Sequence, residues 1–219
     1  MGRFISNFET TEGLANFSGT TGFSIPHVSL TRKDSKVHYF DRYMGHAYVD
    51  LGLPSGTKWA TMNVGATSET SYGNYYQYGK GAAQYAATSG QYDYAGTENP
   101  LATSADTAAQ VWGGGWHMPT RVQMEELTAN TTIQWVENYN ESGKNGGLFT
   151  SKTNGKTLFI PAAGYWDDGS QVYVGSYGYC WGSSPNGSRA YYLFFGSGNK
   201  DVNLSNNRKN GFSVRPVVG

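Results

Sequence analysis

The chain of 219 residues has little charge and a single cysteine, and both shortages argue against whole classes of protein. Lys and Arg together number 16, as do Asp and Glu, so the formal net charge is zero and charged residues make up 15% of the chain, against about 25% on average. A nucleic-acid-binding protein needs a basic surface that displaces counterions, so we expect no nucleic acid partner. The lone Cys180 excludes an intrachain disulfide and a zinc site built from several cysteines.

Long apolar runs are also missing. No stretch of 18 apolar residues occurs, so we expect no membrane insertion. Residues 1–6 lack the apolar core of a signal peptide. This start is expected of a protein that stays in the cell, of one released inside a particle, or of one whose signal has been removed.

The motifs of common enzymes are absent. No phosphate-binding GxxxxGK[ST] loop, Rossmann glycine pattern or GxSxG nucleophile elbow occurs. The four histidines are scattered, and His117 precedes a predicted helix, where we expect a packed or edge residue rather than a ligand.

Two other candidates for chemistry are weak. Asp167 and Asp168 are adjacent, so on a strand they would point to opposite faces, which suits a surface loop better than acid–base chemistry or metal binding. Cys180 has no base beside it in the sequence to activate its thiol. We therefore predict no enzyme activity, no cofactor and no metal.

Glycine and tyrosine are in excess. Gly accounts for 30 residues and Tyr for 17, and aromatic residues make up 15% of the chain. Helical bundles avoid glycine and disordered chains lack aromatic residues, so neither class fits. We expect a loop-rich fold with a polar, uncharged surface.

Residues 1–42 differ from the rest. Strand formers at 23–30 and 36–40 flank a turn at 32–35, which predicts a β-hairpin. A hairpin of this size is not stable alone, so it is expected to pack on the main domain, a sister chain or a neighbour; a partly ordered leader is the alternative. The predicted division is a small β-rich segment, 1–42, and a main domain, 43–219.

Short strands are predicted in the first part of the main domain. Alternation predicts strands at 46–53 and 58–64, separated by a Pro-x-Gly turn, and an apolar strand follows at 157–161. Residues 71–101 show no clear period and predict a long ordered loop.

Two helices are predicted between these strands. One covers 104–111 and ends at the glycines 113–115. The other starts after Pro119, where Thr120 and Gln123 have the spacing of a capping box. Its buried face is expected to come from Val122, Met124 and Leu127.

Residues 165–210 use a narrow set of amino acids. Tyr, Ser, Gly, Asn and Asp make up 29 of these 46 residues. Antibody binding loops favour Tyr, Ser, Gly and Asn, because Tyr gives rigid contact area and the small polar residues give adaptable hydrogen bonds. Residues 211–217 predict a closing strand. The apolar residues that we expect to form a framework are Trp181, Ala190, Leu193, Phe195, Val202, Phe212, Val214 and Val217.

Strand alternation makes a finer prediction after Ala190. It would bury Tyr191, Leu193 and Phe195. It would leave Tyr192 and Phe194 facing outward.

Five stretches occur in an order that points to a family. They are YVDLGLPSGTKWA (48–60) with NVGA (63–66), GGWHMPT (114–120) with EEL (125–127), LFIPAAG (158–164), YCWGSS (179–184) and GFSVRPV (211–217). Over about residues 46–218 the chain resembles the major paralogous domain (FISUMP) family of gut-bacterial surface and phage proteins. The resemblance implies an α+β protein with a C-type lectin fold of the formylglycine-generating-enzyme type, with two helices, small antiparallel sheets and much ordered loop.

The chain departs from two activities of proteins with related folds. The sulfatase-modifying enzymes of that branch use a cysteine pair, whereas Cys180 is alone and lies in no motif that matches the cysteines of those enzymes. The calcium-and-sugar motifs of C-type lectins, Glu-Pro-Asn and Trp-Asn-Asp, are missing, and residues 98–100 are Glu-Asn-Pro. The resemblance therefore implies neither activity.

The resemblance also implies a way in which the sequence could vary. The family includes variable proteins of diversity-generating retroelements, in which a reverse transcriptase with adenine-directed errors rewrites codons near the C-terminal end of the gene. Asn codons then become codons for Tyr, Ser, Asp, Gly, Cys, Phe and others, which fits the composition of 165–210. Cys180 stands where the family usually has Tyr, and Gly182 where it usually has Ser.

The resulting hypothesis is a ligand- or receptor-binding protein with a diversified surface, at a phage tail tip or as an adhesin on a bacterial cell. Its partner would be a protein or glycan on a bacterial surface, and it could form oligomers. Two alternatives stay open: a fixed cell-surface module that binds glycan or protein, and an enzyme of the formylglycine-generating branch. The contact residues that we expect to be exposed are Trp166, Asp168, Ser170, Tyr173, Tyr177, Tyr179, Arg189, Tyr192, Phe194, Lys200, Asp201, Asn203, Ser205, Asn207, Lys209 and Asn210.

Overall fold

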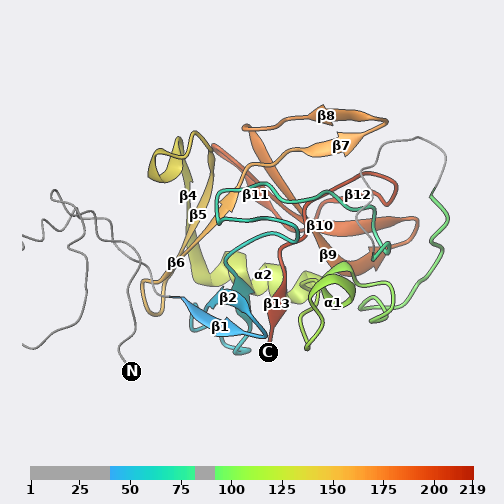
Figure 1. Cartoon of the computed structure of the whole chain (residues 1–219), viewed down its shortest axis with the longest axis horizontal. Helices are drawn as coiled ribbons and strands as arrows, with labels where there is room; N and C mark the ends of the chain where they lie inside the picture. The colour runs from blue at the N-terminus through green and yellow to red at the C-terminus, as the bar shows by residue number, and fades with distance from the viewer. Residues whose placement is uncertain (1–39, 82–91) are drawn as a thin grey trace, which may run out of the picture. The chain divides into compact units, whose positions relative to one another are not determined.

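The computed structural model describes residues 40–81 and 92–219. These residues form small antiparallel sheets with two helices (Figure 1), so the α+β class predicted from the sequence is confirmed. For the N-terminal segment 1–42, the sequence predicts a hairpin or, alternatively, a partly ordered leader. Of this segment, the structure describes only residues 40–42, so the prediction lies outside the described residues.

The first sheet joins the start of the described chain to its end. In sheet order its strands are β1 (Asp41–Tyr43), β2 (His46–Val49), β3 (Lys58–Ala60) and β13 (Val217–Val218). All neighbours are antiparallel, and Trp59 lies opposite both Val49 and Val217. The strands predicted at 46–53 and 58–64 are shorter than expected, and Gly52, at φ +63°, lies outside the extended conformation that a longer first strand would need.

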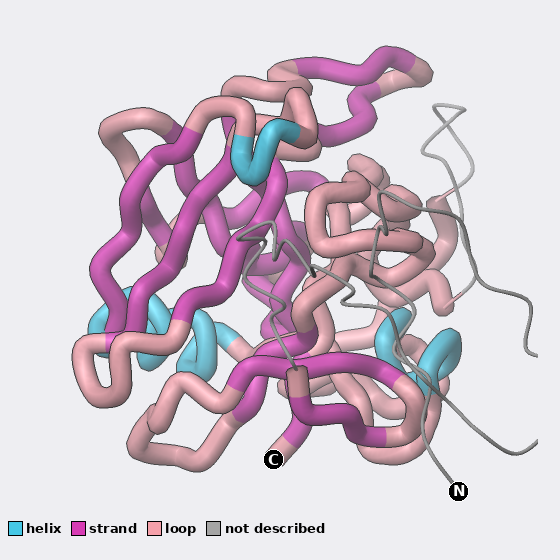
Figure 2. The backbone as a smooth tube through the Cα atoms, turned by 60° about the vertical axis from the view of Figure 1, so that its left-hand side comes forward, coloured by secondary structure: helices cyan, strands magenta, loops and turns pink. Residues whose placement is uncertain are grey.

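A second sheet follows the longer helix. Its strands run side by side in Figure 2 and are, in order, β4 (Thr131–Val136), β5 (Gly146–Ser151) and β6 (Thr157–Pro161). A short 3-10 helix, η1 (Tyr139–Glu141), connects the first two. β6 confirms the apolar strand predicted at 157–161.

The region with the narrow alphabet forms a third sheet and a separate hairpin. The sheet consists of β9 (Tyr177–Asn186), β10 (Arg189–Gly196), β11 (Lys200–Asp201) and β12 (Ser205–Asn207), and β10 pairs with each of the other three. The hairpin, at the top of Figure 1, consists of β7 (Tyr165–Asp167) and β8 (Ser170–Val172). In place of the closing strand predicted at 211–217, isolated bridges at Gly211, Phe212 and Ser213 precede β13.

Helix α1 (Thr107–Trp112) begins later than the predicted start at residue 104. Asp106 sets this start, because its carboxylate accepts a hydrogen bond from the Ala109 amide at 3.0 Å and so caps the helix. The helix ends at Gly113, which has φ +64°, as the run of glycines predicted.

Helix α2 (Arg121–Asn130) begins with the predicted capping box. The Gln123 amide donates to Thr120 Oγ1 at 3.2 Å, and the Thr120 amide donates to Gln123 Oε1 at 2.9 Å. Within the described ranges, neither α2 nor any other helix is long and apolar enough to cross a membrane.

The buried face of α2 differs from the prediction at one residue. Met124 and Leu127 are fully buried, as predicted, but Val122 is 70% exposed. The prediction for Val122 is wrong because residues two apart on a helix point about 200° away from each other, so Val122 and Met124 do not share a face.

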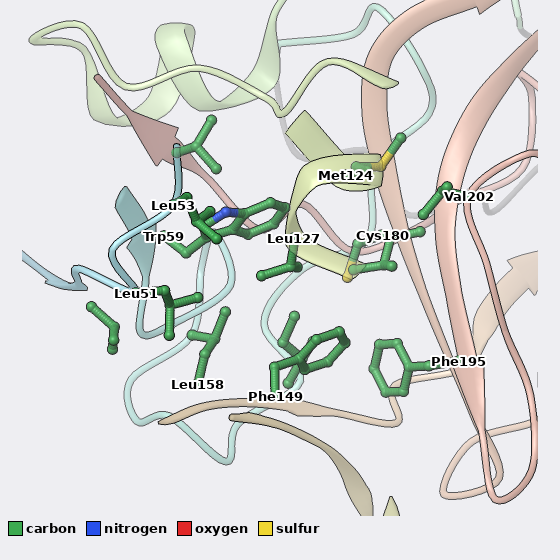
Figure 3. Close-up of a cluster of buried hydrophobic side chains, with 14 residues drawn as sticks. Leu51, Leu53, Trp59, Met124, Leu127, Phe149, Leu158, Cys180, Phe195 and Val202 are labelled. Carbon is green, nitrogen blue, oxygen red and sulfur yellow. The ribbon is translucent and has the colours of Figure 1, made fainter. Parts of the chain in front are cut away.

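Two clusters of buried side chains lie on opposite faces of the β9–β10 pair. On one face, Leu193 and Phe195 pack with residues of α2, β5 and β6, and the Phe195 ring meets the Phe149 ring edge-on at 5.5 Å (Figure 3). On the other face, Trp181 stacks on Phe212 at 4.0 Å. All eight residues predicted to form the framework are buried, so that prediction is confirmed.

We expect Gly178→Ala to lower the free energy of unfolding by about 1–3 kcal/mol, the usual cost of overpacking a core. A Cβ added at Gly178 in β9 would collide with the fully buried ring of Phe195. Gly198→Ala is the matched control, because no atom lies within 4 Å of its added Cβ. Urea unfolding measures both variants, and equal midpoints would contradict this packing.

Candidate ligand-binding surface

One face of the β9–β10 pair carries a row of aromatic side chains. Tyr179 lies opposite Phe194 across the pair, and Trp181 lies opposite Tyr192. Residues two apart on a strand share a face, so Tyr177 extends the row beyond Tyr179. The alternate residues of both strands point the other way, into the cluster of Figure 3.

Aromatic residues from other segments pack against this row. Tyr165 of β7 lies 4.8 Å from Tyr179 between ring centroids, and Tyr173 lies 6.5 Å from it. At the outer end, Tyr177 and Phe194 stack at 5.4 Å. The aromatic cluster, as we use the term, consists of Tyr165, Tyr173, Tyr177, Tyr179, Tyr192, Phe194 and Phe212.

Burial falls from the inner to the outer end of the aromatic cluster. Phe212 is fully buried, Tyr179 and Tyr192 are 8% and 6% exposed, and Tyr173 is 54% exposed. The expectation that Tyr179 and Tyr192 are exposed is wrong, because the Phe212 ring covers this face of the strands at 5.2 Å and 5.0 Å from theirs. A strand covered on both faces buries residues of both parities.

Tyr191 lies at an irregularity in β10 and packs at the margin of the cluster that contains Leu193 and Phe195. The register of the pair shifts between Ala190 and Tyr192. Tyr191, predicted to be buried, is only partly buried here, and the Arg121 guanidinium lies 4.6 Å from the centre of its ring. Phe194 lies on the face opposite to the buried Leu193, as alternation predicts. Its ring packs against the aromatic cluster, so it is only partly exposed to solvent.

Asn210 is the third predicted contact residue that is buried. It is 5% exposed. Its backbone amide donates to the Asn207 carbonyl at 3.1 Å, and its side-chain Nδ2 donates to Asn206 Oδ1 at 3.3 Å. The expectation of exposure is wrong for Asn210, because these two hydrogen bonds hold its backbone and its side chain against residues 206 and 207 of the turn.

The other thirteen predicted contact residues reach the surface. Those that are exposed are Asp168, Ser170, Tyr173, Arg189, Lys200, Asn203 and Asn207. Those that are partly exposed are Trp166, Tyr177, Phe194, Asp201, Ser205 and Lys209. Their part in ligand binding stays a prediction.

Tyr173, Tyr177 and Phe194 belong to the aromatic cluster, whereas Arg189 and Asn207 pair with each other at the opposite end of β10. Lys209 pairs with Asp168 and thereby joins the loop after β12 to the β7–β8 hairpin. Lys200 instead donates to the Thr128 carbonyl of α2 at 3.4 Å, and Asn203 accepts from Arg121 of the same helix. These two lie at the edge of the surface, beside α2.

Charges of both signs occur on this surface. Lys209 Nζ lies 2.7 Å from Asp168 Oδ1, and this hydrogen bond raises the pKa of Lys209. Lys200 and Asp201 line a shallow hollow of about 440 Å³ beside Phe194. Such a surface suits aromatic anchors and hydrogen bonds more than attraction by one sign of charge.

Arg208 is a functional candidate that sequence reasoning missed. It is 4% exposed, and its guanidinium donates to three backbone carbonyls. No sequence signal marks it, because it stands among polar residues in a segment that we interpreted as exposed.

Cys180 and His117 are the two candidates for chemistry considered from the sequence that lie away from this surface. Burial raises the pKa of the Cys180 thiol to about 12, so the thiol stays protonated at neutral pH. His117 is partly buried at a backbone bridge with Val217. Among residues 40–81 and 92–219, no group of three or more His, Cys, Asp or Glu side chains could hold a metal ion.

Comparison of the chain with protein-family models, curated proteins and solved structures finds no match. Function is therefore inferred from the residues, the α+β class and this surface.

Tyr173 and Asp168 have φ values of +60° and +43°, in the left-handed region. That region costs most L-residues about 1–2 kcal/mol, and asparagine tolerates it better. We expect Tyr173→Asn to leave the free energy of unfolding unchanged or to raise it. Tyr177→Asn, the control, should lower it by about 1–2 kcal/mol, because the partly buried Tyr177 loses its stack on Phe194. Equal losses on urea unfolding would contradict strain at Tyr173.

Alkaline pH should destabilise the fold through its buried tyrosines. Burial raises the pKa of Tyr75 and of Tyr192 from 10 to about 12. Because the folded state favours the protonated phenol, this stability is complete below pH 10 and is lost as the pH rises toward 12. We expect the urea midpoint to fall over that range, and less steeply in Tyr192→Phe, which keeps the ring. Equal falls in both proteins would contradict the burial of the Tyr192 hydroxyl.

Proposed function

We propose that this chain is a ligand-binding protein whose contact surface is diversified by a retroelement, on a C-type lectin scaffold of the formylglycine-generating-enzyme type. On this proposal it belongs to the major paralogous domain family. The observation that carries the proposal is how burial divides the last quarter of the chain. Every framework residue expected there is buried, whereas thirteen of the sixteen expected contact residues reach the surface.

The proposed scaffold is supported by where three of the five motif stretches lie. Residues 48–60 contribute to β2 and β3, 158–164 to β6, and 179–184 to β9. Each of these stretches supplies residues of the buried clusters, such as Trp59 and Trp181. Proteins that have the same scaffold need the same core, so motifs that supply core residues support the proposed scaffold.

The surface chemistry supports binding of a macromolecule on a bacterial surface. Trp166, Tyr173 and Tyr177 offer rigid aromatic contact area, and Arg189 is of the residue type that often dominates binding energy. Ser170 and its polar neighbours offer adaptable hydrogen bonds. We infer that such a surface would serve a phage tail tip or a bacterial adhesin.

Two backbone conformations support diversification in particular. Asp168 and Tyr173 are the residues other than glycine with positive φ in the segment 165–210. After glycine, asparagine and aspartate tolerate this conformation best, so Tyr173 is the one of the two that departs from the tolerated residue types. A single change at an adenine of an Asn codon, AAY, gives the codon for Asp or for Tyr, so asparagine is the residue that we infer at both positions of an unmutated template.

Sequencing the DNA around the gene tests this proposal. We expect a near-copy of the segment for residues 165–210 beside a reverse-transcriptase gene, differing from it only where the copy has adenine. The copy should encode asparagine at positions 168 and 173. Framework codons such as that of Trp181 should be identical in both, because their side chains are buried. Differences at other bases, or the lack of a copy, would overturn diversification in favour of a fixed binding module.

A further inference from the structure

Arg208 joins three segments that are distant in the sequence. Its Nε donates to the Arg189 carbonyl at 3.0 Å, its Nη1 to the Gly96 carbonyl at 2.8 Å and its Nη2 to the Gly187 carbonyl at 2.7 Å. The guanidinium carbon also lies 5.0 Å from the ring centroid of Tyr78. A guanidinium holds five donors in a fixed planar fork, an arrangement that the ammonium of lysine does not reproduce.

This shared guanidinium places the loop 92–98 beside the turn between β9 and β10. Gly96 and Gly187 accept from two nitrogens of one side chain, so their backbones are neighbours; Figure 1 shows the loop in green, next to the end of the β9–β10 pair. The Tyr92 hydroxyl donates to the Tyr78 carbonyl at 2.8 Å and anchors the inner side of the loop.

The outer side of the same loop is exposed among the described residues. Its exposed residues are Asp93, Ala95, Thr97 and Glu98, and those of the neighbouring turn are Asn186, Gly187, Ser188 and Arg189. Arg189 is one of the thirteen contact residues that reach the surface. A ligand of extended shape that touched Arg189 would therefore also meet the loop.

We propose that the exposed side of loop 92–98 is a fixed part of the ligand-binding surface, that the ligand is a protein, and that Arg208 is the positioning residue of the loop. The inference rests on the proposed function. An interface between two proteins takes about 20–30 residues on each side, more than the thirteen that reach the surface. Loop and turn supply the remainder, and a small glycan would not need it.

The test uses the full chain displayed on yeast, with the thirteen contact positions randomised, and lysozyme as the protein probe. Lysozyme-binding clones are selected and their Kd is measured. In each clone, Ala95→Arg and Thr97→Arg then place a bulky charge on the loop without touching the core. Thr132→Arg is the matched control, because Thr132 is also exposed but lies in β4 of another sheet.

We expect either loop variant to weaken lysozyme binding at least tenfold in most clones and Thr132→Arg to change it less than twofold. Clones that bind and tolerate both loop variants would overturn the inference and leave the proposed function standing. A library without any lysozyme-binding clone would count against the proposed function, and against the inference with it.

The role of Arg208 is tested by coupling. Arg208→Lys should weaken binding in the selected clones, and Thr97→Arg added to it should weaken binding by less than the product of the two single effects, because the loop has already left its position. Hydrogen exchange should rise at 94–98 and 187–189 and stay unchanged in β5. Independent effects, or exchange that rises throughout the chain, would show that Arg208 supports the fold in general and does not position the loop.

Discussion

The pairing of β9 with β10 is the constraint on which the rest of the surface depends. Alternation sends Leu193 and Phe195 to one face and Trp181 and Tyr192 to the other, and each face is covered by a separate cluster. A slip of one residue would exchange these two sets. Because both clusters hold large, fully buried side chains, such a slip is costly, and the register stays fixed whatever the outer residues are.

Burial along this pair decides which residues are free to serve a ligand. Phe212 covers the inner end of the aromatic cluster, but no described residue covers the outer end in the same way, and Tyr173 and Tyr177 reach the surface there. The exposed rings therefore rest on buried rings. Contact area that is already rigid loses little conformational entropy on binding, so this arrangement suits recognition by side chains whose identity can change.

Sequence reasoning succeeds here where the signal is local or periodic. The capping box of α2 involves Thr120 and Gln123, three residues apart, and the buried positions of Leu193 and Phe195 follow from alternation. It fails where a distant segment decides. Tyr179 and Tyr192 are buried by Phe212, which follows them in the chain by 33 and 20 residues. No pattern within β9 or β10 predicts that Phe212 covers them.

Arg208 is the extreme case, since its three acceptors are 112, 21 and 19 residues away. Arg215, a second buried arginine, has fewer hydrogen-bond partners than Arg208. Its Nη1 donates to the Ala60 carbonyl at 3.1 Å, while its Nε and Nη2 have no partner among the described residues. Burial lowers the pKa of Arg215 to about 10.

Under the proposed diversification, the segment 165–210 must still keep the residues that support its backbone. Tyr179, Tyr192 and Asn210 lie among the contact candidates in sequence but inside the structure, and Arg208 ties the segment to a loop outside it. Loss of the Arg208 fork would leave three carbonyls to find other donors and a void where the guanidinium lay. Under the proposed diversification, the range of surfaces is therefore limited by those positions of the segment that also hold the backbone in place.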